Sequence, residues 1–163
     1  MSSLSSNIDI IINTLTSDFG TNYHIEHWLP EVNNSDTFSR LAKKALSIHK
    51  PSIFISPMTA DCKQASTVLG GDNTRAIPVP VVINSLSMIL FVKKTAYDTN
   101  GLDLYKLEEN VMNSLVNLKL SSSNSFLLLD STVRSNTAYN NNIVMNSIIN
   151  YKFSYLINGE LIS

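Results

Sequence analysis

The sequence predicts an α+β fold in a single domain that spans residues 1–163. The expected architecture is one mainly antiparallel mixed sheet of about four to five strands, with an N-terminal helix and a long helix packed on one face. Three patterns support it: apolar residues at helical spacing in two segments, an apolar strand between them, and alternation near the C-terminus. A chain of 163 residues and 18.1 kDa is long enough to bury one hydrophobic core.

The first segment, residues 4–19, places its apolar side chains on one helical face and predicts an amphipathic helix. Ser5 or Ser6 is expected to cap its N-terminus, and Gly20 is expected to end it. The apolar residues are Leu4, Ile8, Ile11, Ile12, Leu15 and Phe19.

Three shorter elements are expected next. Residues 23–29 are aromatic and are closed by Pro30, which favours an extended piece at the sheet edge, because proline cannot donate to a ladder. Residues 36–48 have apolar side chains three and four apart and predict a second helix. Pro51 stops that helix, and residues 52–56 (SIFIS) follow as a buried strand.

A long segment without convincing periodicity lies between residues 57 and 80. It begins at Pro57 and contains Gly70, Gly71 and two further prolines, Pro78 and Pro80, so the sequence predicts a long loop at about residues 58–78. Loops of this length are uncommon in compact domains and are usually functional or disordered. This loop is therefore the first place to look for a partner contact.

The middle of the chain predicts a strand and a helix. Residues 81–94 are apolar on both faces apart from Ser85 and Ser87, as expected for a central strand. A turn at residues 97–101 leads to the clearest helical pattern, in residues 104–118. The buried stripe of this helix is Leu104, Leu107, Val111, Met112, Leu115 and Leu118.

The C-terminal part predicts a hairpin. A strand at residues 126–130 is followed by a loop that holds Asn136, Asn140, Asn141 and Asn142, which tolerate left-handed backbone conformations. The second strand alternates, so that one side faces the core and the other faces water or a neighbouring subunit. The residues expected on the core side are Ile149, Tyr151, Phe153, Tyr155 and Ile157.

Composition excludes several classes of protein. Charged residues make up 15% of the chain and the net charge is −1, so the electrostatic footprint of a nucleic-acid binder is missing. The 23 Ser and 19 Asn residues indicate a surface that is polar but uncharged. The longest apolar stretch, residues 77–92, is interrupted by prolines, Asn and Ser, and we expect no membrane span.

Candidate catalytic and metal-binding residues are few. His24 and His27 point to opposite sides if their segment is extended, and no Cys, Asp or Glu cluster completes a zinc shell. Cys62 is the single cysteine, which favours a reducing compartment, and it has no histidine placed near it. No P-loop, nucleophile elbow or metalloprotease motif occurs. We therefore expect no catalytic residues, no metal, no cofactor and no enzymatic activity.

Several pieces of the sequence follow one another in a characteristic order. They are the N-terminal amphipathic helix, SIFIS after a proline, and a strand-turn-helix unit, VVINSLSMILFVKKTAYDTNGLDLYKLEENVMNSLVNL. FLLLDSTVR and a long alternating strand ending NYKFSYLI come next. In this order the chain resembles the tail terminator (tail-completion) proteins of long-tailed bacteriophages or phage-like contractile tails. The resemblance covers most of the chain and departs from the common pattern at residues 36–48 and 57–80.

The resemblance implies a structural virion protein that caps the tail tube as a homohexameric ring and provides the tail side of the head–tail junction. The implied partners are further copies of the chain, the tail tube protein and a neck or head-completion protein. DNA would pass through the ring without specific binding. The protein would be found in the virion tail, after assembly in the host cytoplasm.

Subunit or tube contacts are expected from two regions: the long loop, with Asp61 and Arg75, and the hairpin tip, with Arg134, Tyr139 and Asn140. A ring subunit needs two different, complementary surfaces, and few charges lower the desolvation cost of burying them. Two alternatives stay open. One is a neck or head–tail joining protein; the other is a small ligand- or peptide-binding module, which needs a concave pocket with convergent polar groups.

Overall fold

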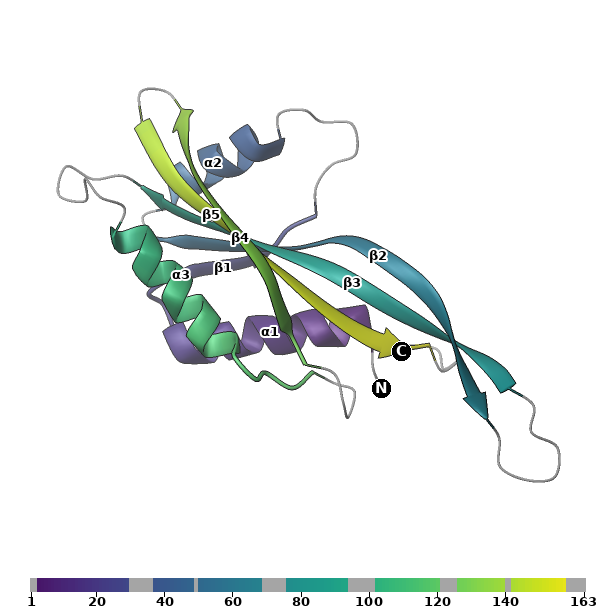
Figure 1. The fold of residues 1–163 in the computed structure, drawn as a ribbon. Helices are drawn as coiled ribbons and strands as arrows, with labels where there is room; N and C mark the ends of the chain where they lie inside the picture. The colour runs from purple at the N-terminus through teal and green to yellow at the C-terminus, as the bar shows by residue number, and fades with distance from the viewer. Residues whose placement is uncertain are drawn as a thin grey trace.

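A computed structural model describes residues 3–29, 37–48, 50–68, 76–93, 102–120, 126–139 and 142–157 of the chain (Figure 1). Three helices and five strands lie within these residues. In chain order they are α1 (Leu4–Phe19), β1 (His24–His27), α2 (Thr37–Ser47), β2 (Ser52–Val68), β3 (Ala76–Lys93), α3 (Leu102–Leu115), β4 (Leu128–Tyr139) and β5 (Asn142–Leu156).

The strands form one mixed sheet in the order β1-β2-β3-β5-β4. β1 runs parallel to β2, and every other neighbouring pair is antiparallel. The predicted α+β class is confirmed, and so are the edge position of β1 and the central position of β3. An isolated antiparallel bridge between Lys119 and Phe126 lies outside these strands.

Helices α1 and α3 pack against the same face of the sheet, as predicted (Figure 1). The predicted cap of α1 is wrong: Ser3, not Ser5 or Ser6, caps the helix, and its Oγ accepts the Ser6 N–H at 3.1 Å in a capping box. Gly20 ends the helix, at a positive φ of 57° that glycine adopts without strain. The buried residues that α1 and α3 contribute to this core are Ile8, Ile11, Leu15, Leu104, Leu107, Val111 and Leu115.

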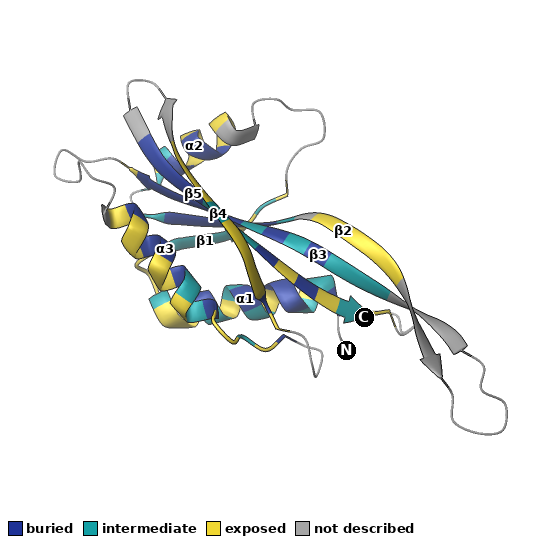
Figure 2. Ribbon diagram, in the orientation of Figure 1, coloured by how far each residue is buried: buried dark blue, intermediate teal, exposed yellow. Residues whose placement is uncertain are grey.

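Helix α2 covers the opposite face with a smaller apolar cluster (Figure 2). It lies against β3 and β4, so it covers only part of that face. Phe54 and Phe91 meet edge to face beneath it, with ring centroids 5.8 Å apart. The buried members of the cluster are Leu41, Ala42, Ala45, Phe54, Ile89, Phe91 and Val144.

The loop predicted at about residues 58–78 is wrong for most of its length, because β2 continues to Val68 and β3 begins at Ala76. The two strands pair without a break from the bulge at Met58 to the pair formed by Val68 and Ala76. We call residues 57–68 of β2 with residues 76–86 of β3 the arm. Its distal part, residues 64–68 with residues 76–80, projects beyond the rest of the sheet, past the last β3–β5 pair (Figure 1).

The C-terminal hairpin also has longer strands than predicted. Asn136 and Asn142 lie within the ladder, not in a loop, and Tyr139 pairs with Asn142 at its end. The expected alternation of β5 is observed for Tyr151 and Phe153, which are buried, and for Lys152, which is exposed. Ile157, expected on the core side, lies after β5 and is exposed.

Candidate functional site

The outer side of β4 is a long open edge of the sheet. β4 has 12 residues and pairs only with β5 among the described strands. Natural edge strands are usually short, or are blunted by lysine, proline or inward-pointing charges. β4 instead exposes large apolar side chains, and Figure 2 shows it in the exposed colour along its lower part. They are Leu128 (63% exposed), Leu129 (53%) and Val133 (57%).

A buried carboxylate fixes β4 to the helix beside it. Glu108 of α3 is 2% exposed and accepts hydrogen bonds from Arg134 Nε at 3.0 Å and Arg134 Nη2 at 2.5 Å. Ser147 Oγ of β5 donates to the same carboxylate at 2.6 Å. The hydrogen bonds to Glu108 raise the pKa of Arg134, and its guanidinium lies 5.4 Å from the centre of the Tyr105 ring. This network attaches Arg134 of β4 to α3.

Sequence analysis placed Arg134 at the hairpin tip and did not single out Glu108. One signal marks Glu108: it lies four residues after Leu104 and three before Val111, within the apolar stripe of the helix. A carboxylate in a buried stripe requires a charged or hydrogen-bonding partner.

The sheet face that α2 leaves uncovered carries a ladder of small polar side chains. Ser87 Oγ donates to Asn150 Oδ1 at 2.7 Å, and Asn150 Nδ2 donates to Ser131 Oγ at 3.0 Å, which links β3, β5 and β4. Asn146 Nδ2 donates to Ser135 Oγ at 2.8 Å four residues further along β4. Part of the Ser and Asn excess therefore forms cross-strand contacts.

The arm provides a second open edge on the other side of the sheet. β1 pairs with β2 only as far as Ile55, and Trp28 N–H donates to the Ile55 carbonyl at 2.9 Å. Within the described chain no strand pairs with the outer side of β2 beyond that point. Residues 59–63 are all exposed (Figure 2).

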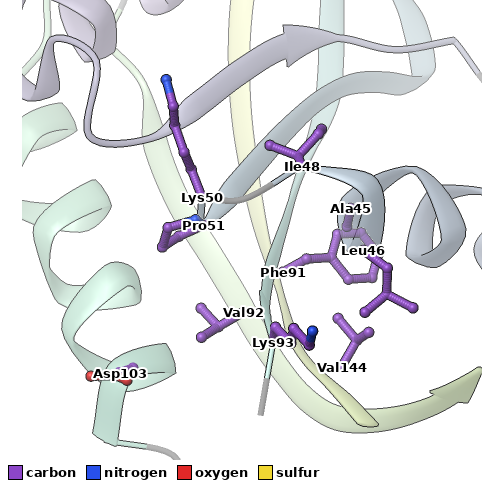
Figure 3. A pocket seen from close by; sticks show the side chains of 10 residues that line it. All are labelled: Ala45, Leu46, Ile48, Lys50, Pro51, Phe91, Val92, Lys93, Asp103 and Val144. Atoms are coloured by element: carbon purple, nitrogen blue, oxygen red, sulfur yellow. The ribbon is translucent and has the colours of Figure 1, made fainter. Parts of the chain in front are cut away.

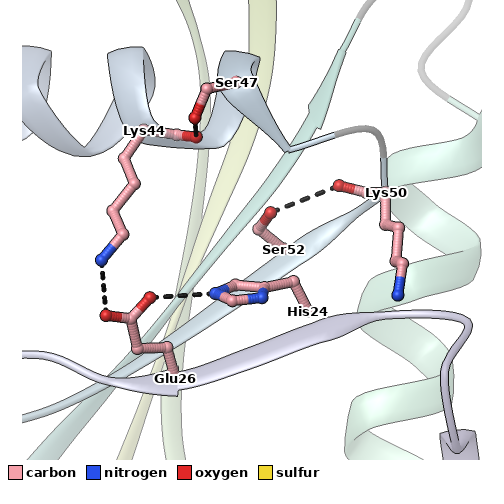
Figure 4. A network of polar contacts seen from close by, with 6 residues as sticks. All are labelled: His24, Glu26, Lys44, Ser47, Lys50 and Ser52. Carbon is pink, nitrogen blue, oxygen red and sulfur yellow. Dashed lines mark hydrogen bonds and ion pairs between the residues drawn. The ribbon is translucent and has the colours of Figure 1, made fainter.

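The edge at β1 is short, and side chains attach it to α2; we call it the closed edge. Lys44 Nζ of α2 donates to Glu26 Oε1 at 2.5 Å, and His24 Nε2 lies 2.9 Å from Glu26 Oε2 (Figure 4). Partial burial works to raise the pKa of Glu26, but the hydrogen bonds from His24 and Lys44 outweigh it and lower that pKa. His24 thus pairs with a neighbouring carboxylate, whereas His27 has the opposite strand parity and is exposed.

A cleft of about 310 Å³ lies beside α2, where the ends of β3 and β5 meet the start of α3 (Figure 3). Its floor is apolar, with Phe91 and Val144 among the lining side chains. Its charged lining residues are Lys50, Lys93 and Asp103. In Figure 3 Lys50 extends away from the apolar lining side chains, so these charges do not converge on one point.

The structure places the predicted contact residues on different strands. Asp61 lies in β2 opposite Ile83 and is exposed, and Arg134 lies in β4, with β3 and β5 between them. Tyr139 is the last residue of β4, and Arg75 and Asn140 lie outside the described residues. The predicted residues therefore form no single site; Asp61 and Arg134 mark the two open edges.

The described residues offer little other candidate chemistry. Cys62 is exposed on β2. The described residues contain no group of three or more His, Cys, Asp or Glu side chains arranged to hold a metal ion. None of the helices within those ranges has the length and apolar character required to span a membrane.

No protein-family model matches the chain, and a comparison with curated proteins finds no matching relative.

Proposed function

We propose that this protein is a structural subunit that assembles with further copies of itself into a ring, in the role of a phage tail terminator. The observation that carries the proposal is the pair of unlike open edges, β4 and the arm, on opposite sides of one sheet. Rings form when one patch on a subunit meets a different patch on the next subunit. A sheet with a different open edge on each side supplies that pair of patches.

The composition of β4 favours a role in an assembly interface rather than as a solvated surface. Interface cores are depleted in charged residues. On β4 the described side chains include only two charges, Asp130 and Arg134. Arg134 is already bound to Glu108, and Lys152 Nζ lies 3.4 Å from Asp130 Oδ1. Covering this edge would therefore desolvate few unpaired charges.

In the proposed role the ring caps the tail tube and offers its other side to a neck or head-completion protein. The protein then performs no chemistry, binds no cofactor, and allows DNA to pass without specific contacts. Its place is the virion tail, and a hexameric ring is the expected assembly.

The test combines mass measurement with binding. Light scattering on the purified chain across a wide range of concentrations is expected to give a discrete oligomer with the mass of a ring. The oligomer is then sedimented with purified tail tubes or with tailless capsids. Binding to tubes supports the terminator role, and binding to capsids alone supports a neck protein instead. A monomer at every concentration that binds neither would refute the proposal.

The ligand-binding alternative draws on one observation, the apolar cleft beside α2. Ligand pockets combine an apolar lining with a few converging polar groups. A thermal-shift screen with small apolar anions and cations distinguishes the two functions. A ligand that raises the melting temperature of wild-type protein but not of a Val144→Trp variant, which fills the cleft, would favour the alternative.

A further inference from the structure

We infer that the two open edges pair with each other between copies: β4 of one copy adds as an antiparallel strand to the outer side of the arm of the next. The inference rests on the proposed function, because it requires self-assembly, and it goes further by naming the strands in contact. Main-chain pairing of this kind, in which an exposed sheet edge accepts a strand from another chain, recurs in protein recognition.

The strand directions in the sheet already match this pairing. β2 and β5 run one way, and β3 and β4 run the other way. If the next copy is rotated so that the two sheets lie edge to edge, β2 of that copy lies against β4 of the first copy. Strand directions then continue to alternate across the contact. The new pair is then antiparallel, which is the slightly more stable kind of pairing.

The two edges also match in length. β4 has 12 residues, and the arm exposes a similar length of β2 beyond the reach of β1. Arg134 adds no charge pair to this contact, because it pairs with Ser147 on the α3 side of the sheet and is bound to Glu108, whereas Asp61 pairs with Ile83 on the α2 side.

Pairing of β4 with β4 would be the competing arrangement, in a symmetric dimer. It would cover one edge of each copy and leave the arm exposed. The distal part of the arm has only two strands, since β3 pairs with β5 no further than Val81. Isolated two-stranded hairpins are marginally stable in water. Pairing between β4 and the arm covers both edges in every copy and gives the arm its third strand.

One geometric consequence follows from the position of the arm. Because the arm extends past the end of β5, each copy is offset along the strand direction relative to the last. Strands in a closed ring with such an offset are inclined to the ring axis, as they are in β-barrels.

The single native cysteine supplies the test, because Cys62 lies exposed on the arm. Cysteines are introduced one at a time along β4. Leu129→Cys and Thr132→Cys lie on the sheet face that Cys62 shares, whereas Ser131→Cys, Val133→Cys and Ser135→Cys lie on the opposite face; each variant is oxidised mildly. Disulfides require Cα atoms within about 7 Å, which neighbouring strands satisfy only at nearly opposite positions on the same face. We expect a ladder of disulfide-linked oligomers of increasing size. It should form readily for cysteines at some positions of β4 and poorly for cysteines one residue away.

Each variant is also made with Cys62→Ser, which is expected to abolish the ladder. Wild-type protein is expected to give no ladder, since it has no second cysteine. Linked dimers that persist with Cys62→Ser would show β4–β4 pairing and overturn the inference. Protein that light scattering shows to be assembled, but that links at no position, would overturn the inference and leave the proposed function standing. Protein that is monomeric throughout would overturn both.

Discussion

Strands β1 and β4 both border the sheet, yet they differ in length and in how they are covered. β1 has four residues, and the Glu26–Lys44 ion pair attaches it to α2. β4 has 12 residues, and exposes Leu128 and Val133 along its length. The arm resembles β4 in this respect, because β2 continues well beyond the end of β1.

The difference shows that the fold leaves some edges of its sheet open to pairing and not others. Edge strands invite pairing with other chains, and proteins that stay monomeric shorten or cover them. This chain does so at β1 and leaves β4 and the arm open. We interpret the closed edge as a structural feature of the folded subunit and the open edges as assembly surfaces. The following variants test that division, in order of decreasing effect on the free energy of unfolding.

The largest effect is expected beneath the closed edge, for Phe54→Ala. Phe54 is fully buried, pairs with Glu26 across strands, and contacts Phe91. Removing such a buried ring leaves a cavity and costs about 3–5 kcal/mol. The control is Phe126→Ala, because Phe126 is 44% exposed; it should cost less than about 1 kcal/mol by urea denaturation. Equal losses for the two variants would contradict the assignment of the core.

An intermediate effect is expected for Glu108→Gln, which weakens the attachment of β4 to α3. The neutral amide replaces a buried carboxylate that accepts hydrogen bonds from Arg134 and Ser147. We expect a loss of about 1–3 kcal/mol in the free energy of unfolding. The neighbouring Glu109→Gln is the matched control, since Glu109 is exposed and should change stability by less than about 0.5 kcal/mol. If Glu109→Gln costs as much, the network does not hold β4.

A smaller, pH-dependent effect is expected for Glu26→Gln. Partly exposed ion pairs contribute about 0.2–1 kcal/mol. The pKa of Glu26 is lowered in the folded protein, so its contribution is complete above the ordinary value of 4.5 and is lost as the pH falls through the folded-state value. The stability difference between wild type and Glu26→Gln should therefore shrink on acidification. A difference that grows below pH 4.5 would show that the pKa is raised instead.

Elements with one buried face could be predicted from the sequence, and the arm could not. The stripe of α3 and the alternation of β5 follow from burial on one side only, which leaves a periodic pattern. In the arm, residues 59–63 are all exposed, so no periodicity marks the strand. Pro78 and Pro80 also favoured a loop. In the structure both prolines lie in the part of β3 that extends beyond the end of β5. Because they are two residues apart, the backbone positions without an N–H can both be on the side of β3 that has no partner strand.

The candidate surface was predictable only in part, for a related reason. The sequence directed attention to Asp61 and Arg134, but it could not place them on opposite edges, because strand order depends on pairing between distant segments. The ion pair between Glu108 and Arg134 joins residues that are 26 positions apart in the sequence, and it depends on α3 lying near β4. Such contacts leave a local signal only where a charge interrupts an apolar stripe.

The smallest change in stability, and the most direct test, is expected for Val133→Lys on β4. Val133 is 57% exposed, so the free energy of unfolding of the subunit should change by less than about 0.5 kcal/mol. The added lysine blocks an edge from pairing with another strand. Val116→Lys, at a residue that is 64% exposed beside α3, is the matched control.

The deciding measurement is light scattering on wild type, Val133→Lys and Val116→Lys at matched concentrations. We expect wild type and Val116→Lys to form the same discrete oligomer and Val133→Lys to remain monomeric with an unchanged circular dichroism spectrum. A Val133→Lys protein that assembles as wild type does would contradict the claim that the open β4 edge is an assembly surface.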